Sequence, residues 1–286
     1  MGDEHSPLGA LMRPLRLRIE DSLAAPKQCT GAVKVWLTKQ YNQVKWSAPN
    51  MTSMLMPGHA EIYNALPNVE DADKERQSRT EFDNFLDDFA EILVEAELYK
   101  VGLDEIAGPL LLHSHFPVSG DTAIVERPAV LDDGRPALVA RPEAVIPEAV
   151  AVRWKWQPET AQFHPLEYCT DPVAVSSAQK LSQNPDFLSA VGQLLESYGL
   201  HDVIGLTVLP RSLEVKEAGL VYFERSADDL SVTTVEASSL PGIITAWAAT
   251  ITNEGVRIRP QTRCDLTTRF CGSCKCRRTT CVSDPD

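Results

Sequence analysis

The chain has 286 residues, and 43% of them are hydrophobic, which is enough to bury a sizeable core. It contains no apolar run of the roughly 20 residues that a membrane-spanning helix needs, so we expect no membrane partner. The net charge is −13, and the −20 carried by residues 51–256 disfavours nucleic acid as a partner, whereas residues 257–286 carry +4.

The N-terminal segment, residues 1–50, is interrupted by prolines and carries a net charge of +3. Apolar and polar residues alternate over residues 33–37, which predicts a strand. The first residues are acidic, and no apolar stretch typical of a secretory signal follows them. We therefore expect a cytoplasmic protein, in which clustered thiols bind metal more often than they form disulfides.

The next segment, residues 51–150, is predicted to form a first α+β unit. Apolar residues recur at helical spacing over residues 80–99, opposite an acidic face, which predicts an amphipathic helix. An apolar strand over residues 109–118 and a second strand over residues 122–126 follow it. The turn Ser119-Gly120-Asp121 between them predicts a β-hairpin.

Residues 151–256 repeat this order and form the second predicted unit. A helix over residues 186–200 precedes a strand over residues 204–215 and another over residues 219–225. The two units also share short sequences at matching places, namely Phe85-Leu86 with Phe187-Leu188 and Glu126-Arg127 with Glu224-Arg225. We interpret this match as an internal repeat.

The fold class that follows is α+β. We expect two similar helix-plus-hairpin units around an antiparallel sheet, followed by a basic Cys-rich tail over residues 257–286. The paired Glu and Arg residues at the strand ends are either functional carboxylates and arginine clamps or ion pairs that support the hairpins. A ligand would bind at the junction of the two units.

A candidate metal site lies in the first unit. His113 and His115 are two residues apart on a predicted strand, so both side chains would project from one face. Such a pair can bind metal if a third ligand is present, and Glu126, His59 and His164 are the candidates. The alternative is that both histidines are hydrogen-bonded residues of a half-buried strand.

Cys169 is a second candidate. It lies close in sequence to His164, and the two residues would serve as a nucleophile and its base. The alternative is that Cys169 is a buried apolar residue, as single cysteines commonly are.

The strongest chemical signal is in the tail. Five of the seven cysteines lie in the last 23 residues, at positions Cys264, Cys271, Cys274, Cys276 and Cys281. Cys271-x2-Cys274 is a zinc-chelating spacing, and Cys264 or Cys276 together with Cys281 would complete four thiolates. The close spacing also suits Cu(I), which prefers soft ligands. Disulfide or redox chemistry and an unstructured tail are the alternatives.

From the sequence we expect a metal-binding protein in which the tail cysteines hold Zn²⁺ or Cu(I) and the acidic body binds a protein partner. The alternative is a metal-dependent enzyme, acting on a small-molecule substrate, with its metal bound by His113 and His115. The first unit alone carries this histidine pair, so function would differ between the two units.

Overall fold

The computed structural model describes residues 55–95, 102, 106–213, 215, 219–227, 230–252 and 255–265. The chain divides into two units, residues 1–44 and 45–286, and all described residues belong to the second. The strand predicted at residues 33–37 and the four cysteines beyond Cys264 lie outside the described residues.

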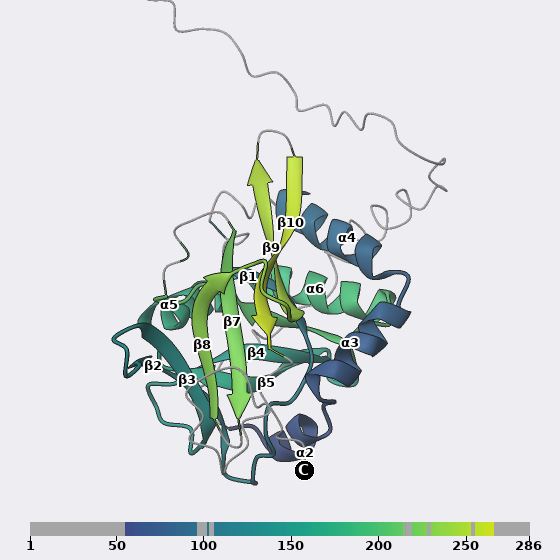
Figure 1. Cartoon of the computed structure of the whole chain (residues 1–286). Coiled ribbons are helices and arrows are strands. Elements are labelled where there is room, and N and C mark those ends of the chain that lie inside the picture. Colours follow the sequence, from purple (N-terminus) through teal and green to yellow (C-terminus); the bar gives the residue numbers. More distant parts are fainter. Residues whose placement is uncertain are drawn as a thin grey trace, which may run out of the picture. The chain divides into compact units, whose positions relative to one another are not determined.

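The described residues form five helices and ten strands (Figure 1). The helices are α2 (His59–Asn64), α3 (Val69–Ser78), α4 (Phe82–Glu95), α5 (Pro172–Ser182) and α6 (Pro185–Ser197). The strands are β1 (Ala107–Leu111), β2 (Ala123–Val130), β3 (Pro136–Glu143), β4 (Val150–Gln157), β5 (Gln162–Cys169), β6 (Ile204–Val208), β7 (Leu220–Ala227), β8 (Leu230–Ala237), β9 (Ile243–Thr252) and β10 (Gly255–Cys264).

All ten strands join one closed barrel in the order β1-β6-β4-β5-β2-β3-β8-β7-β10-β9, and β9 returns to β1. The pairs β2–β5 and β7–β10 are parallel, and the other pairs are antiparallel. Closure removes most of the strand edges that an open sheet would expose. The predicted open antiparallel sheet is therefore wrong, because the fold is a mostly β, mixed barrel.

The hairpins predicted for the two units are also wrong. β1 pairs with β6 and β9 rather than with β2, and β6 pairs with β1 and β4 rather than with β7. The physical reason is burial, since all five residues of β1 and of β6 are buried. A strand covered on both faces lies in the interior, and an apolar run does not reveal which strand is its partner.

Glycines allow β1 and β6 to approach their neighbours closely. A Cβ at Gly108 would collide with the carbonyl oxygen of Trp247 on β9. A Cβ at Gly205 would collide with the carbonyl oxygen of Trp154 on β4. Each central strand therefore needs glycine at this position.

The order of elements nevertheless recurs along the chain, since α4-β1-β2 is followed later by α6-β6-β7. The order of strands around the barrel shows a symmetry. If β1, β2, β3, β4 and β5 change places with β6, β7, β8, β9 and β10, respectively, the same order results but runs around the barrel in the opposite direction. The same exchange converts the parallel pair β2–β5 into β7–β10. It also converts the contact of Gly108 with Trp247 into the contact of Gly205 with Trp154. This arrangement supports an internal duplication as a proposal, although not in the hairpin form that the sequence predicted.

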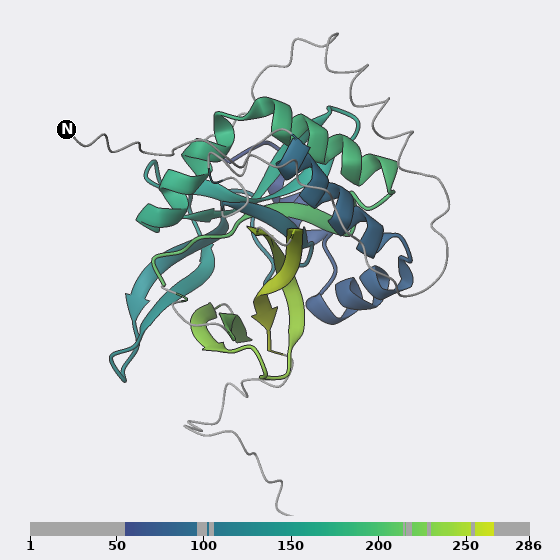
Figure 2. The same ribbon diagram turned by 90° about the horizontal axis from the view of Figure 1, so that it is seen from above.

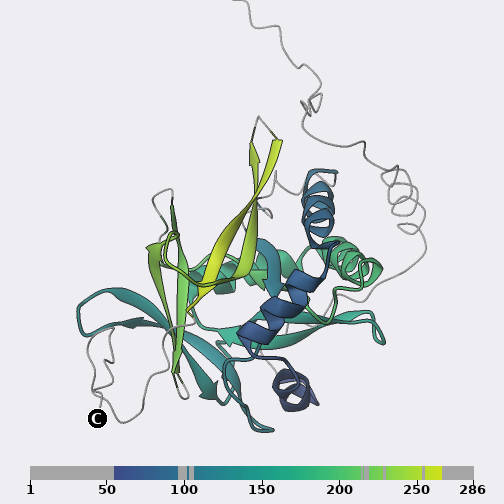
Figure 3. The same cartoon turned by 45° about the vertical axis from the view of Figure 1, so that its right-hand side comes forward.

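Three of the helices lie together on one side of the barrel. Figures 2 and 3 show α3 and α4 (blue) and α6 (green) gathered there. Phe85, Phe89 and Leu93 of α4 are fully buried, and Phe89 packs edge-on against Phe187 of α6. The apolar spacing of the sequence therefore forms the contact between helices and strands. No helix in the described part of the chain is long and apolar enough to cross a membrane.

Candidate metal centre

Three potential metal ligands meet inside the barrel. His113 and His115 lie in the segment after β1, and Glu224 lies on β7. One nitrogen or oxygen atom from each of them falls within 4.8 Å of the others. The side chains are almost completely buried, with 4% exposure for His115 and 3% for Glu224. These are two imidazoles and one carboxylate, a donor set that suits Zn²⁺.

His113 is held in the tautomer that a ligand needs. Its Nδ1 lies 2.8 Å from the carbonyl oxygen of Leu111, so Nδ1 carries the proton and donates it. Nε2 then keeps its lone pair, and this atom is buried without a hydrogen-bond partner among the described residues. Burial lowers the pKa of His113 to about 4, so the ring is neutral at pH 7. A neutral imidazole oriented by a backbone carbonyl is the usual state of a metal-binding histidine.

His115 is held in the same tautomer as His113. Its Nε2 lies 3.2 Å from Arg153 Nη1, and a guanidinium can only donate, so Nε2 is the acceptor. Its Nδ1, 3.0 Å from Ser226 Oγ, therefore carries the proton and donates to that hydroxyl. Burial lowers the pKa of His115 to about 4 as well. Both rings thus have Nε2 as the atom with a lone pair.

Glu224 is ionised in spite of its burial. Burial opposes its charge, but Arg153 and the two histidines outweigh this effect and bring the pKa of Glu224 to about 2. Arg153 Nη2 donates to Oε1, whereas Oε2 is buried without a partner among the described residues. One carboxylate oxygen of Glu224 therefore remains without a partner in the group that also contains His113 and His115.

Arg153 and Glu167 complete the cluster. Arg153 Nη1 lies 3.3 Å from Glu167 Oε2, and Tyr63 of α2 donates to Glu167 Oε1 over 3.3 Å. The same Tyr63 hydroxyl accepts from the backbone nitrogen of His115 over 3.2 Å, which positions the segment after β1. Burial raises the pKa of Glu167, the charge of Arg153 offsets this effect only in part, and the charge of Glu224 adds to it.

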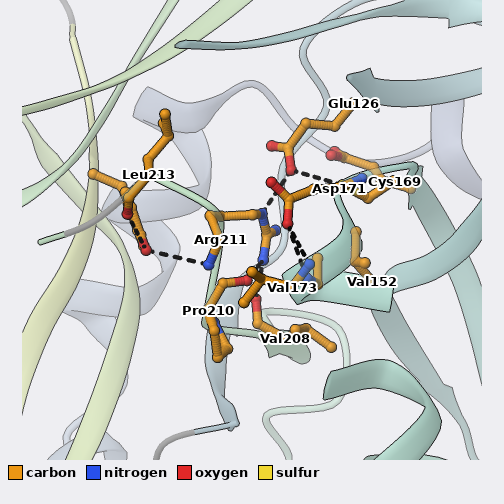
Figure 4. A network of polar contacts seen from close by, with 12 residues as sticks. Glu126, Val152, Cys169, Asp171, Val173, Val208, Pro210, Arg211 and Leu213 are labelled. Atoms are coloured by element: carbon orange, nitrogen blue, oxygen red, sulfur yellow. Dashed lines mark hydrogen bonds and ion pairs between the residues drawn. The ribbon is translucent and has the colours of Figure 1, made fainter. Parts of the chain in front are cut away.

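A second buried network is built around Arg211 and Glu126 (Figure 4). Arg211 Nε donates to Glu126 Oε1 over 2.6 Å, and the Cys169 thiol donates to the same oxygen over 3.2 Å. Asp171 accepts from the backbone nitrogens of Val173 and Ala174 at the start of α5. Each of these side chains has at least one partner, so this network is an ion pair with supporting hydrogen bonds.

The structure separates Cys169 from the histidine proposed as its base. Burial, followed by the charge of Glu126, raises the pKa of the Cys169 thiol, which disfavours a thiolate nucleophile. His164 instead stacks on His59, with ring centroids 5.9 Å apart, between β5 and α2. Neither His59 nor His164 belongs to the cluster of His113 and His115.

Cys264 is buried at the end of β10, opposite Glu224 in the register of the parallel pair. Burial, with the nearby Glu224, raises the pKa of its thiol to about 12, so it is protonated at neutral pH. This burial does not favour a ligand set shared with the tail. The other tail cysteines, Cys271, Cys274, Cys276 and Cys281, lie outside the described residues.

The sequence named the two histidines but not their third ligand or their arginine. β1 ends at Leu111, so the side chains of His113 and His115 do not share a face of a strand. They meet because the segment after β1 is fixed on α2, with ring centroids 4.7 Å apart. Glu224 was recognisable only as the counterpart of Glu126, and Arg153 gave no signal.

The interior between the two networks contains a small cavity. Glu126 and Arg211 line it from one network, and Arg153 and Glu224 from the other. Its free volume of about 20 Å³ is on the scale of a single water molecule. This cavity can therefore hold a water molecule beside Arg153 and Glu224, but not an organic substrate.

The fold and the site together define a closed mixed barrel with a buried His-His-Glu cluster. Comparison with known proteins finds no matching family model, no matching curated protein and no matching solved structure. The function must therefore be argued from the site itself.

Proposed function

We propose that this protein binds a divalent transition-metal ion, with Zn²⁺ as the first candidate, through His113, His115 and Glu224. The observation that carries the proposal is the group of His113, His115 and Glu224, whose ligand atoms lie within 4.8 Å of one another. Two buried atoms of this group, His113 Nε2 and Glu224 Oε2, have no hydrogen-bond partner among the described residues. A buried polar atom without a partner costs about 1–3 kcal/mol. A bound cation would satisfy both atoms at once.

The donor set restricts the choice of metal. Imidazole nitrogen suits Zn²⁺, Fe²⁺, Ni²⁺ and Cu²⁺, whereas Mg²⁺ and Ca²⁺ prefer sites made of oxygen. Two histidines and one glutamate leave a fourth position open on tetrahedral Zn²⁺, which a water molecule would fill. This open position favours the metal-dependent enzyme as a second candidate, although the small cavity supports binding first.

The test needs a protein in which the tail cannot contribute. The full chain with Cys271, Cys274, Cys276 and Cys281 replaced by serine serves as the background. We expect this protein to retain about one equivalent of Zn²⁺ by elemental analysis after extensive dialysis. His113→Ala and Glu224→Gln in the same background should each reduce the content below a tenth of an equivalent.

A matched control comes from His201, which lies beside Asp202 and outside the cluster. His201→Ala in the same background should leave the Zn²⁺ content unchanged. Loss of all metal on replacing the four cysteines would refute the barrel site and support the tail thiolates instead. If the background retains one equivalent of metal and the unaltered chain holds more, the chain has two metal sites.

A further inference from the structure

Arg153 lies at the centre of the proposed metal site. Its Nη1 is 3.2 Å from His115 Nε2 and 3.3 Å from Glu167 Oε2, and its Nη2 binds Glu224 Oε1. The side chain is only 8% exposed, so its charge is stabilised by these two carboxylates rather than by water. The positive charge of Arg153 therefore already offsets part of the negative charge at the site.

The position of Arg153 is set by a β-bulge. The register of β4 against β5 shifts on both sides of the Arg153–Glu167 pair. The register of β10 against β9 shifts in the same way around the Thr262–Ala246 pair. The second bulge forms without an ion pair, so the bulge itself does not require Arg153 and Glu167. Bulges often turn a side chain toward a functional site.

Arg153 and a metal ion cannot bind His115 together. Nε2 of a neutral imidazole has one lone pair, which either accepts from Arg153 Nη1 or binds the ion. Glu224 differs, because Arg153 uses Oε1 while Oε2 is open. Metal binding therefore needs only the Arg153–His115 hydrogen bond to break.

Glu167 provides the alternative partner. Its Oε2 already lies 3.3 Å from the same Nη1, and Tyr63 holds its other oxygen. A small rotation of the guanidinium would replace the hydrogen bond to His115 with a closer ion pair to Glu167. The negative charge of Glu167 would also offset part of the repulsion between Arg153 and a divalent ion.

On these grounds, and resting on the proposed metal centre, we propose that Arg153 competes with the metal ion for the site. It holds His115 Nε2 when metal is absent and shifts onto Glu167 when metal binds. Arg153 is thus a positioning residue that weakens metal binding and selects among metal ions. A bound cation must be strong enough to displace it, which disfavours weakly coordinating ions.

Two variants with opposite expected effects test this proposal in the background that lacks the four tail cysteines. Arg153→Ala with Glu167→Thr copies the pair found in the β9–β10 bulge and removes the competing charge. We expect it to bind Zn²⁺ about tenfold more tightly or better, measured against a chelator of known affinity. Glu167→Gln keeps the shape but removes the charge that accepts Arg153, so its affinity should fall several-fold.

The direction in which each variant changes the Zn²⁺ affinity distinguishes the possible roles of Arg153. If Arg153 only braces the ligands, both variants lose affinity, and the competition proposal is overturned while the metal centre stands. An unchanged affinity in the double variant overturns it equally. If neither the background nor the double variant binds Zn²⁺ or Co²⁺, the metal centre itself is refuted. The absorption spectrum of bound Co²⁺ checks that the same ligands are used in each variant.

Discussion

Glu126 and Glu224 hold corresponding places on β2 and β7, yet their neighbours give them different roles. In the parallel pairs, Glu126 lies opposite Cys169 and Glu224 lies opposite Cys264. Glu126 Oε1 accepts from Arg211 and from the Cys169 thiol, whereas Glu224 binds Arg153 and lies in one group with two histidines. The same residue type therefore serves stability in one half and, on our proposal, metal binding in the other.

The Glu126–Arg211 pair gives a stability prediction. Glu126→Ala leaves the Arg211 guanidinium buried with only the carbonyl oxygens of Val208 and Pro210 as acceptors. We expect the free energy of unfolding to fall by about 3–5 kcal/mol, because an unpaired buried charge is far less favourable than a paired one. Urea denaturation followed by circular dichroism measures this change.

The control is the neighbouring pair on β2 and β3. Arg127 and Glu143 form an ion pair whose side chains are 33% and 23% exposed. Glu143→Ala should cost less than about 1 kcal/mol, because water can replace the lost partner. Equal losses in the two variants would contradict a special role for the buried pair.

At the scale of an element, α2 connects the surface of the barrel to the candidate site. Tyr63 on this helix holds the backbone of His115 and the carboxylate of Glu167. His59, one turn earlier, stacks on His164 of β5 and contacts the carbonyl oxygen of Pro165. The docking of α2 on β5 therefore depends on two buried histidines.

This contact predicts acid sensitivity. Burial, with the nearby His59 and Lys155, lowers the pKa of His164 to about 4, from the ordinary value of 6.5. Below pH 6.5 the unfolded chain binds a proton that the folded chain refuses, so stability is complete above pH 6.5 and falls toward pH 4. We expect His164 to contribute a loss of roughly 2 kcal/mol between pH 7 and pH 4.5.

The matching variant is His164→Gln, which cannot titrate. Its free energy of unfolding should decline less than that of the unaltered protein over the same pH range, by roughly 2 kcal/mol. Urea denaturation at pH 7 and pH 4.5 gives both values. Parallel pH profiles for the two proteins would show that the His59–His164 contact does not govern the acid response.

At the scale of the whole barrel, the two halves of the sequence interleave. β6 lies between β1 and β4, and β3 pairs with β8, so neither β1–β5 nor β6–β10 forms a closed sheet alone. The closing contact is also shared between the halves, since Leu110 of β1 pairs with Ala246 of β9. Most apolar core residues lie in one cluster that draws on both halves.

This interleaving predicts one cooperative unit. We expect the slowest amides of β1–β5 and of β6–β10 to exchange with deuterium at the same limiting free energy. Mass spectrometry of peptides covering residues 107–169 and 204–264 can compare them. Protection in one half that persists after the other has exchanged would contradict a single barrel unit.

The sequence predicted several elements well. The amphipathic pattern at residues 80–99 contains α4, and the pattern at residues 186–200 contains most of α6, because helical spacing is a local property. The second strand of each unit and the order of elements also agree with the structure. Strand pairing was wrong because β1 and β6 are buried on both faces, and such strands carry no alternation that identifies a partner.

What the sequence determined by itself is local: the main helices, many strand positions, the acidic body and the two histidines as candidates for metal binding. Only the tertiary structure decided that the strands close into a barrel and that Glu224 and Arg153 meet His113 and His115. These contacts join the segment after β1 with β4 and β7, which lie far apart along the chain. Periodicity reports the burial of a side chain but carries no information about its distant neighbours.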